Sequence, residues 1–113
     1  MNSSVLKWPE GSEVREAARK WAIEVLRDPN VKRAGYFGSY AQGREGVGSD
    51  LDLVVVLESA ELPFARRGLL FDTSSLPVPE DLLVYSDREF QEILARGDRF
   101  SRELGEHAVW FTR

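Results

Sequence analysis

Two aspartates at the start of an apolar run are the residues of this sequence best suited to chemistry. Asp50 and Asp52 are separated by one leucine and are followed by the apolar residues 53–57. Side chains two apart on a strand point to the same face, so the two carboxylates would share one patch of solvent. Two like charges this close require a counter-charge, and Mg²⁺ prefers carboxylate and phosphate oxygens as ligands. An isolated pair of this kind is often only a solvated strand start, so the neighbouring residues decide the interpretation.

A glycine-rich loop leads into this pair. Gly38 and Ser39 follow an apolar segment, and four glycines occur between positions 38 and 48. Glycine permits positive φ angles and a close approach of the backbone, while a serine hydroxyl and the amides that follow it can bind phosphate oxygens. Phosphate-binding groups and metal-binding carboxylates are therefore predicted to converge.

The segment GSYAQGREGVGSDLDLVVV, residues 38–56, resembles the Gly-Ser and Asp-x-Asp signature of the DNA polymerase β nucleotidyltransferase superfamily. The short chain and the placement of Gly43 and Ser49 are similar to the minimal nucleotidyltransferases, whose genes often adjoin those of HEPN-domain proteins. The resemblance covers Val31 to Tyr85 well and the two ends of the chain only loosely.

The resemblance implies a third carboxylate on a later strand. Asp81 opens an apolar segment and is the preferred candidate, with Glu80 as the alternative. By this resemblance Asp50 and Asp52 ligate two Mg²⁺ ions, and Asp81 binds one of them and helps to deprotonate the acceptor hydroxyl. Two such ions stabilise the attacking and leaving oxygens of an in-line displacement. The implied reaction transfers a nucleoside monophosphate, most simply AMP from ATP, and releases pyrophosphate.

Gly38 and Ser39 would then hold the β- and γ-phosphates. Arg44 either absorbs charge that develops in the transition state or is a solvated loop residue. Many minimal members of the family carry arginine where this chain has Gln42, so the usual cation at that place is missing. Arg44 could replace it from two positions along the chain.

The family also implies a partner and an acceptor. The expected partner is a HEPN-domain RNase toxin, which the minimal nucleotidyltransferase neutralises as an antitoxin by adenylylating a tyrosine. The competing hypothesis is a binding module that occludes its partner without turnover, which the Gln42 departure favours. A third option, modification of a small molecule such as an aminoglycoside, needs an acceptor pocket for which this length leaves little room.

Length and composition limit the remaining possibilities. The chain has 113 residues, of which 42% are hydrophobic and 30% charged, so a single globular domain over residues 1–113 is expected. It has no cysteine, which excludes disulfides and thiolate metal sites. Its net charge of −4 disfavours direct nucleic-acid binding. No apolar run is long enough to cross a membrane, and the expected location is the cytoplasm.

The elements that must position these residues follow from periodicity and breakers. A helix is predicted from the N-cap Ser12 to Leu26, ended by Asp28-Pro29-Asn30. Strands are predicted at Val31–Phe37, Leu51–Leu57, Asp81–Tyr85 and His107–Thr112. Further helices are predicted at Phe64–Phe71, after an N-cap at Ser86 or Asp87, and at Arg99–Leu104. The expected fold is α/β, a short mixed sheet with helices mainly on one face, like the palm of polymerase β.

A few residues outside the motif have simpler interpretations. His107, the only histidine, stands before an apolar segment and is interpreted as structural. Trp21 lies on the apolar face of the first helix and is predicted to be core. Trp8 and Trp110 either cover the sheet, which we favour, or mark a partner-binding patch. Tyr40 is interpreted as a helix-packing residue, with nucleotide contact as the alternative.

Overall fold

The computed structural model describes residues 7–113 and confirms an α/β fold. In chain order the elements are α1 (Gly11–Val25), β1 (Val31–Phe37), α2 (Ser39–Gln42), β2 (Leu51–Leu57), the 3₁₀ helix η1 (Phe64–Leu70), β3 (Glu80–Ser86), α3 (Asp87–Ala95), α4 (Arg99–Arg102), the π-helical turn η2 (Glu103–His107) and β4 (Val109–Phe111). Both β1 and β2 have the predicted bounds. No helix of residues 7–113 is long and apolar enough to cross a membrane.

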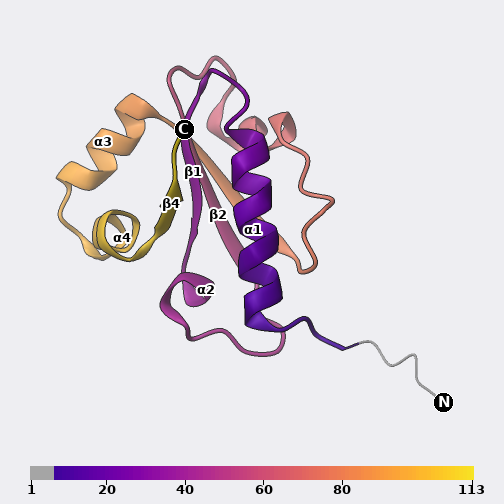
Figure 1. Cartoon of the computed structure of the whole chain (residues 1–113). Helices are drawn as coiled ribbons and strands as arrows, with labels where there is room; N and C mark the ends of the chain where they lie inside the picture. The colour runs from indigo at the N-terminus through magenta and orange to yellow at the C-terminus, as the bar shows by residue number, and fades with distance from the viewer. Residues whose placement is uncertain (1–6) are drawn as a thin grey trace.

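The four strands form one mixed sheet in the order β3-β2-β1-β4 (Figure 1). Strand β1 is antiparallel to both of its neighbours, β2 and β4, whereas β2 and β3 are parallel. A parallel pair needs a crossover between its strands, and residues 58–79, including η1, make this connection. As a result, β2 and β3 both begin at the end of the sheet where β1 leads into α2 (Figure 1).

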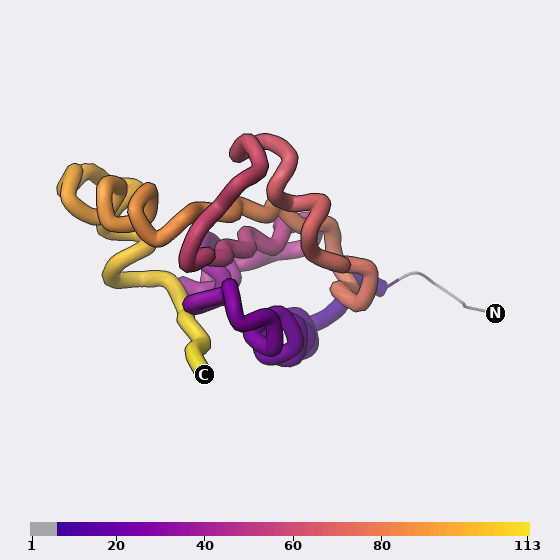
Figure 2. The backbone as a smooth tube through the Cα atoms, turned by 90° about the horizontal axis from the view of Figure 1, so that it is seen from above, coloured from indigo at the N-terminus to yellow at the C-terminus, as the bar shows by residue number. Residues whose placement is uncertain are grey.

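The sheet is covered on both faces, which corrects the expectation of helices mainly on one face. Helix α1 lies on one side, and α3 and α4 lie on the other (Figure 2). Alternate residues of β2 enter the two cores: Leu51, Leu53, Val55 and Leu57 pack in the α1 core, and Val54 and Val56 in the α3 core. A strand buried on both faces is apolar almost throughout, so helices are required on both sides of this sheet.

The start of α1 differs from the prediction. Its N-cap is Glu10, not Ser12, and the backbone amide of Glu10 donates to Oε1 of Glu13 at 3.3 Å. Glutamate at the third helical position is the residue that closes a capping box, so the earlier start satisfies the free amides of the first turn. The helix ends at Val25, before the predicted breaker at Pro29.

The connection between β2 and β3 is anchored by a buried arginine. Arg67 of η1 is only 7% exposed, donates to the carbonyl of Val84 at 3.1 Å and pairs with Glu89 of α3 at 2.6 Å. This bonding joins the connection, β3 and α3. The helix predicted at Phe64–Phe71 is present as a 3₁₀ helix ending at Leu70.

The last part of the chain is less regular than predicted. The helix expected at Arg99–Leu104 is divided between α4 and η2, and β4 begins at Val109 because His107 belongs to η2. Trp110 packs on Phe90 with ring centroids 5.3 Å apart, which agrees with a covering role. Trp8 is partly buried against the α1 core, and Trp21 is buried in that core as predicted.

Candidate active site

The Gly38–Ser39 turn joins the end of β1 to α2. Gly38 has φ 74° and ψ −149°, a region open in practice only to glycine. Its carbonyl accepts hydrogen bonds from the amides of Ala41 at 3.1 Å and Gln42 at 3.2 Å, which holds the turn closed. A Cβ atom at position 38 would collide with Oδ2 of Asp52. The turn backbone and the Asp52 carboxylate are therefore in direct contact, and glycine is required there.

Asp52 and Asp81 stand side by side on neighbouring strands. They are paired in the parallel register of β2 and β3, and the residues on either side of Asp52, Leu51 and Leu53, are fully buried in the α1 core. Since side chains alternate along a strand, Asp52 and Asp81 share the opposite face, the one that carries α3 and α4. Asp50 is exposed and lies just before β2.

Register also separates the two candidates for the third carboxylate. Glu80 is paired with Leu51 and accepts a hydrogen bond from the Thr73 hydroxyl at 2.8 Å. Glu80 therefore binds Thr73 of the connection between β2 and β3. Asp81 is exposed and is the one aligned with Asp52.

The electrostatics of the site centre on Asp52. Burial raises the pKa of its carboxyl, and neighbouring negative charges raise it further, to about 6. In decreasing order these charges are those of Asp81, Glu103 and Asp50. Burial and like charges both disfavour the ionised carboxylate, so a cation at this place would be strongly favourable.

Glu103 is a site residue that the sequence analysis did not find. It lies at the start of η2, and its charge reaches Asp52 from the α4 side of the sheet. Nothing in the spacing of the motif points to it. The π-helical turn η2, a kind of turn that often occurs at functional sites, marks this place in the structure but could not be predicted from the sequence.

The carboxylates of the site suit a hard divalent cation, although they do not form a complete coordination shell. Within residues 7–113 no three histidine, cysteine or acidic side chains are already gathered at metal-binding distance. Asp52 and Asp81 nevertheless offer paired carboxylate oxygens on one face, with Asp50 close enough to perturb the pKa of Asp52. Carboxylates that repel one another in the absence of a cation move together when it binds, so these residues fit Mg²⁺.

A basic pocket of about 300 Å³ lies beside the turn. Its lining residues are Gln42, Arg44, Arg99, Arg102, Glu103 and His107. Thus Gln42 of α2 and Arg44 of the following loop face residues from the end of the chain, and His107 borders this pocket. A cavity of similar size, lined by Asn30 and Arg67 among others, lies at the Leu57 end of β2, away from the aspartates.

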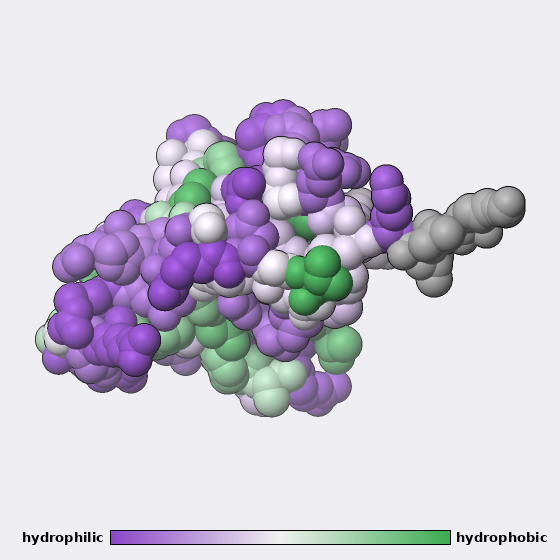
Figure 3. Space-filling view, turned by 90° about the horizontal axis from the view of Figure 1, so that it is seen from below, coloured by the Kyte–Doolittle hydropathy of each residue, from purple (hydrophilic) through white to green (hydrophobic). Residues whose placement is uncertain are grey.

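Hydrophilic side chains dominate this end of the molecule. Figure 3 views it from below, and the hydrophilic surface is most continuous on the side of α4. Tyr40 of α2, by contrast, is 1% exposed, and its hydroxyl donates to the carbonyl of Ser49 at 3.4 Å. Its burial supports the packing interpretation over contact with a nucleotide.

One sequence family and one solved structure that match this chain are informative about its family and fold. The sequence profile of the nucleotidyltransferase domain family matches residues 19–110. A crystal structure from Sulfolobus solfataricus, of a protein provisionally assigned as a nucleotidyltransferase, superimposes with a TM-score of 0.63. It is 20% identical in sequence, and the match covers 91% of this chain and 84% of that one, a likeness of fold. None of the curated proteins matches the sequence significantly.

Proposed function

The chain belongs to the nucleotidyltransferase domain family, and from this premise we propose that it transfers AMP from ATP to a hydroxyl group in a Mg²⁺-dependent reaction. The observation that carries the proposal is the alignment of Asp52 with Asp81 beside the Gly38–Ser39 turn. Two paired carboxylates next to a phosphate-binding turn are what nucleotidyl transfer needs. The family itself supports nucleotidyl transfer in general.

Each residue has a role that follows from its place. Gly38 and Ser39 would bind phosphate oxygens through the backbone and the serine hydroxyl. Asp50, Asp52 and Asp81 would hold Mg²⁺, which neutralises the triphosphate and stabilises the attacking and leaving oxygens. Asp81, exposed at the start of β3, is free to accept the proton of the acceptor hydroxyl.

We propose a protein as the acceptor, in particular a tyrosine of a HEPN-domain toxin that this chain would neutralise as an antitoxin. The support is the resemblance to minimal nucleotidyltransferases together with the net charge of −4. An acidic protein is complementary to a basic, RNA-cleaving partner, and such complementarity favours fast association.

The competing function is a binding module that neutralises its partner by occlusion. One observation favours it: Gln42 supplies no charge where many minimal family members have arginine. Against it, a site without turnover has no physical reason to keep Asp52 beside Asp81, since that pairing is unfavourable.

Transfer of label from ATP tests the proposal. The wild-type protein is mixed with a HEPN-domain partner, Mg²⁺ and ATP labelled in the α-phosphate or adenine. The Asp50→Asn plus Asp52→Asn variant is compared with Glu92→Gln, an exposed carboxylate of α3. Label should pass to the partner with the wild type and the Glu92 variant, but not with the double variant. A tight complex without any transfer by the wild type would instead support occlusion.

A further inference from the structure

Exposed apolar side chains gather on the connection between β2 and β3. In residues 7–113 six large apolar side chains are exposed, and four of them lie within positions 62–70: Leu62, Phe64, Leu69 and Leu70. We call these four residues the η1 patch. Single exposed apolar residues are common on protein surfaces, whereas a contiguous group of them marks an interaction site. The connection also stands out from the body of the molecule (Figure 2), where another protein can reach it.

The η1 patch is held rigidly, although it belongs to a connection. The rings of Phe64 and Tyr85 have centroids 5.3 Å apart, and the guanidinium of Arg67 lies 5.8 Å from the centroid of the Phe64 ring. Arg67 also donates from Nε to the carbonyl of Leu62 at 2.8 Å. Little conformational entropy is therefore lost when this surface binds a partner, which favours binding.

A hollow of about 320 Å³ adjoins the patch and reaches the end of β2. Its apolar lining consists of Leu57, Ala60, Leu62 and Leu70. Glu61 is an exposed carboxylate at the rim. Arg67 also borders the hollow, but its charge is already paired with that of Glu89. The hollow therefore suits an apolar side chain that has a positive charge beside it.

The same segment carries a side chain that matches this hollow. Leu69 is 81% exposed, so most of the side chain projects into solvent. Arg66 precedes it by three residues, one full turn of a 3₁₀ helix, and lies on the same side of η1. Both Arg66 and Glu61 are exposed, and neither takes part in an ion pair within residues 7–113. One surface therefore carries an apolar knob beside a positive charge and an apolar hollow beside a negative charge.

We propose that this surface binds a second copy of the chain, related to the first by a twofold axis. A twofold contact uses the same patch twice, so Leu69 of each copy enters the hollow of the other. In the same contact Arg66 of each copy pairs with Glu61 of the other. A surface for a different protein needs only a knob or only a hollow. The presence of both, with opposite charges beside them, favours a second copy as the occupant.

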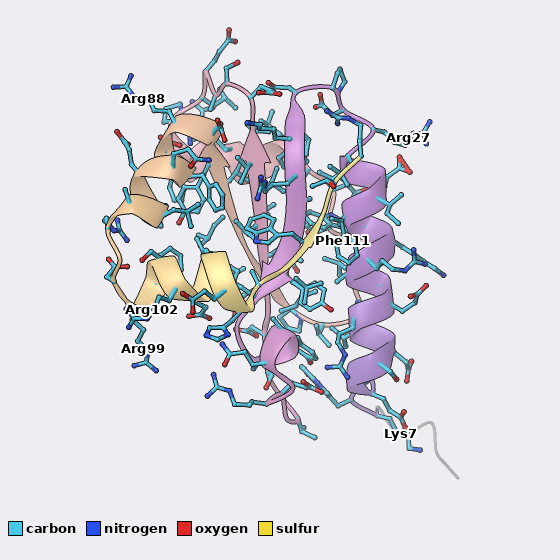
Figure 4. The ribbon with its side chains drawn as sticks, turned by 60° about the vertical axis from the view of Figure 1, so that its left-hand side comes forward. Lys7, Arg27, Arg88, Arg99, Arg102 and Phe111 are labelled. Atoms are coloured by element: carbon cyan, nitrogen blue, oxygen red, sulfur yellow. The ribbon has the colours of Figure 1, made fainter. Side chains whose placement is uncertain are left out.

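The contact leaves the candidate active site open and does not depend on the proposed function. The hollow lies at the Leu57 end of β2, whereas Asp52 lies at the start of that strand. Figure 4 shows Arg27, after the end of α1, and Arg88, near the start of α3, at the first of these ends, and Lys7 at the other. Both active sites of the dimer therefore face away from the contact.

The area of the contact limits its strength. A standard interface buries about 800 Å² on each partner, from about 20 to 30 residues. The patch, the hollow and the two charges lie mainly within residues 57–70. We therefore expect a weak dimer with a Kd of about 1 to 100 μM.

Sedimentation velocity of the full chain at about 5 to 500 μM covers this range of Kd. The wild type should sediment near its monomer mass of 12.8 kDa at the lowest concentration and approach twice that mass at the highest. Leu69→Glu places a charge in the hollow beside Glu61 of the other copy and should raise the Kd by about a hundredfold. The matched control is Val47→Glu, at a side chain that is 88% exposed in the loop before β2, and it should dimerise as the wild type does. Circular dichroism checks that both variants are folded.

Charge reversal tests the pairing between copies. Arg66→Glu and Glu61→Arg should each raise the Kd by about tenfold, because each leaves like charges facing across the axis. An equimolar mixture of these two variants should associate as tightly as the wild type, because both facing pairs are then attractive. Both variants keep a negative net charge, since the wild type has −4 and each substitution changes it by two, so net charge does not explain this rescue. The mixture also replaces Leu69→Glu as the test if that variant does not fold.

Several results would overturn the proposal. One is a wild type that stays monomeric at the highest concentration, and another is a folded Leu69→Glu variant that dimerises as well as the wild type. Equal disruption by Val47→Glu, or a mixture of the charge variants no tighter than either alone, would also do so. If the wild type is monomeric and Leu69→Glu abolishes its binding to a HEPN-domain protein, the patch belongs to that partner instead.

Discussion

Replacing Gly38 by alanine should cost far more than the same change at Gly43, although both glycines have positive φ. Gly38 has φ 74° and ψ −149°, and Gly43 has φ 69° and ψ 25°. A Cβ atom at 43 meets no atom within 4 Å, whereas one at 38 collides with the carboxylate of Asp52. The two substitutions therefore differ in backbone region and in steric contact, and both differences act against position 38.

The magnitudes follow from these two terms. Alanine in the left-handed region costs about 1 kcal/mol, the value expected for Gly43→Ala. At position 38 the glycine-only backbone region and the collision together should cost about 3 kcal/mol. Since 1 kcal/mol corresponds to about 4 °C for a chain of this size, Gly38→Ala should lower the Tm by about 12 °C and Gly43→Ala by about 4 °C.

The assay combines thermal unfolding, followed by circular dichroism, with titration of Mg²⁺ and ATP below the melting range. Gly43→Ala should bind nucleotide nearly as the wild type does. Gly38→Ala should bind it weakly even where it is fully folded, because the displaced Asp52 carboxylate no longer faces the turn. Tm values of the two variants that agree to within about 2 °C, which corresponds to about 0.5 kcal/mol, would refute the steric argument for the contact between Gly38 and Asp52.

Three further predictions concern single side chains. The Arg67 guanidinium holds the pKa of Glu89 down at about 2, below its ordinary value of 4.5. The folded-state pKa is depressed, so this stabilisation is complete above pH 4.5 and is lost as the pH falls towards 2. Glu89→Gln should then lower the free energy of unfolding in urea by about 1 kcal/mol at pH 7 and by almost nothing at pH 2. The value at pH 7 is kept small because the Glu89 side chain is 39% exposed and solvent screens the ion pair. A loss of stability that does not change with pH would contradict this prediction. Asp81→Asn should abolish label transfer while Glu80→Gln retains it, because only Asp81 is aligned with Asp52; the opposite pattern in the transfer assay would show that the register argument is wrong. Arg113 donates to the carbonyls of Leu26, Asp28 and Val31, so Arg113→Ala should lower the free energy of unfolding by about 1 to 2 kcal/mol, and an unchanged denaturation midpoint would show that these bonds contribute nothing.

The central strands and the turn between them could be predicted because their signals are local. The continuous apolar run 53–57 marks β2 as a strand buried on both faces, while Pro29 before β1 and Gly38 after it limit β1, so the bounds of both strands agree with the prediction. The same local reasoning failed at the start of α1, where Ser12 and Glu10 are both able to cap and only the bonded pair of Glu10 and Glu13 distinguishes them. It also failed for the distribution of helices over the two faces of the sheet, which depends on packing.

By itself the sequence determined that Asp50 and Asp52 lie next to a glycine–serine turn, since the two-residue period of a strand and the backbone freedom of glycine are properties of short segments. Only the tertiary structure decided that Asp81, and not Glu80, is aligned with Asp52, because the register of two parallel strands is set by packing across a long connection. Only the tertiary structure brought Glu103 near Asp52 and placed the arginines of α4 opposite Arg44. These residues are far apart in the chain, and no local pattern records that folding places them around one site.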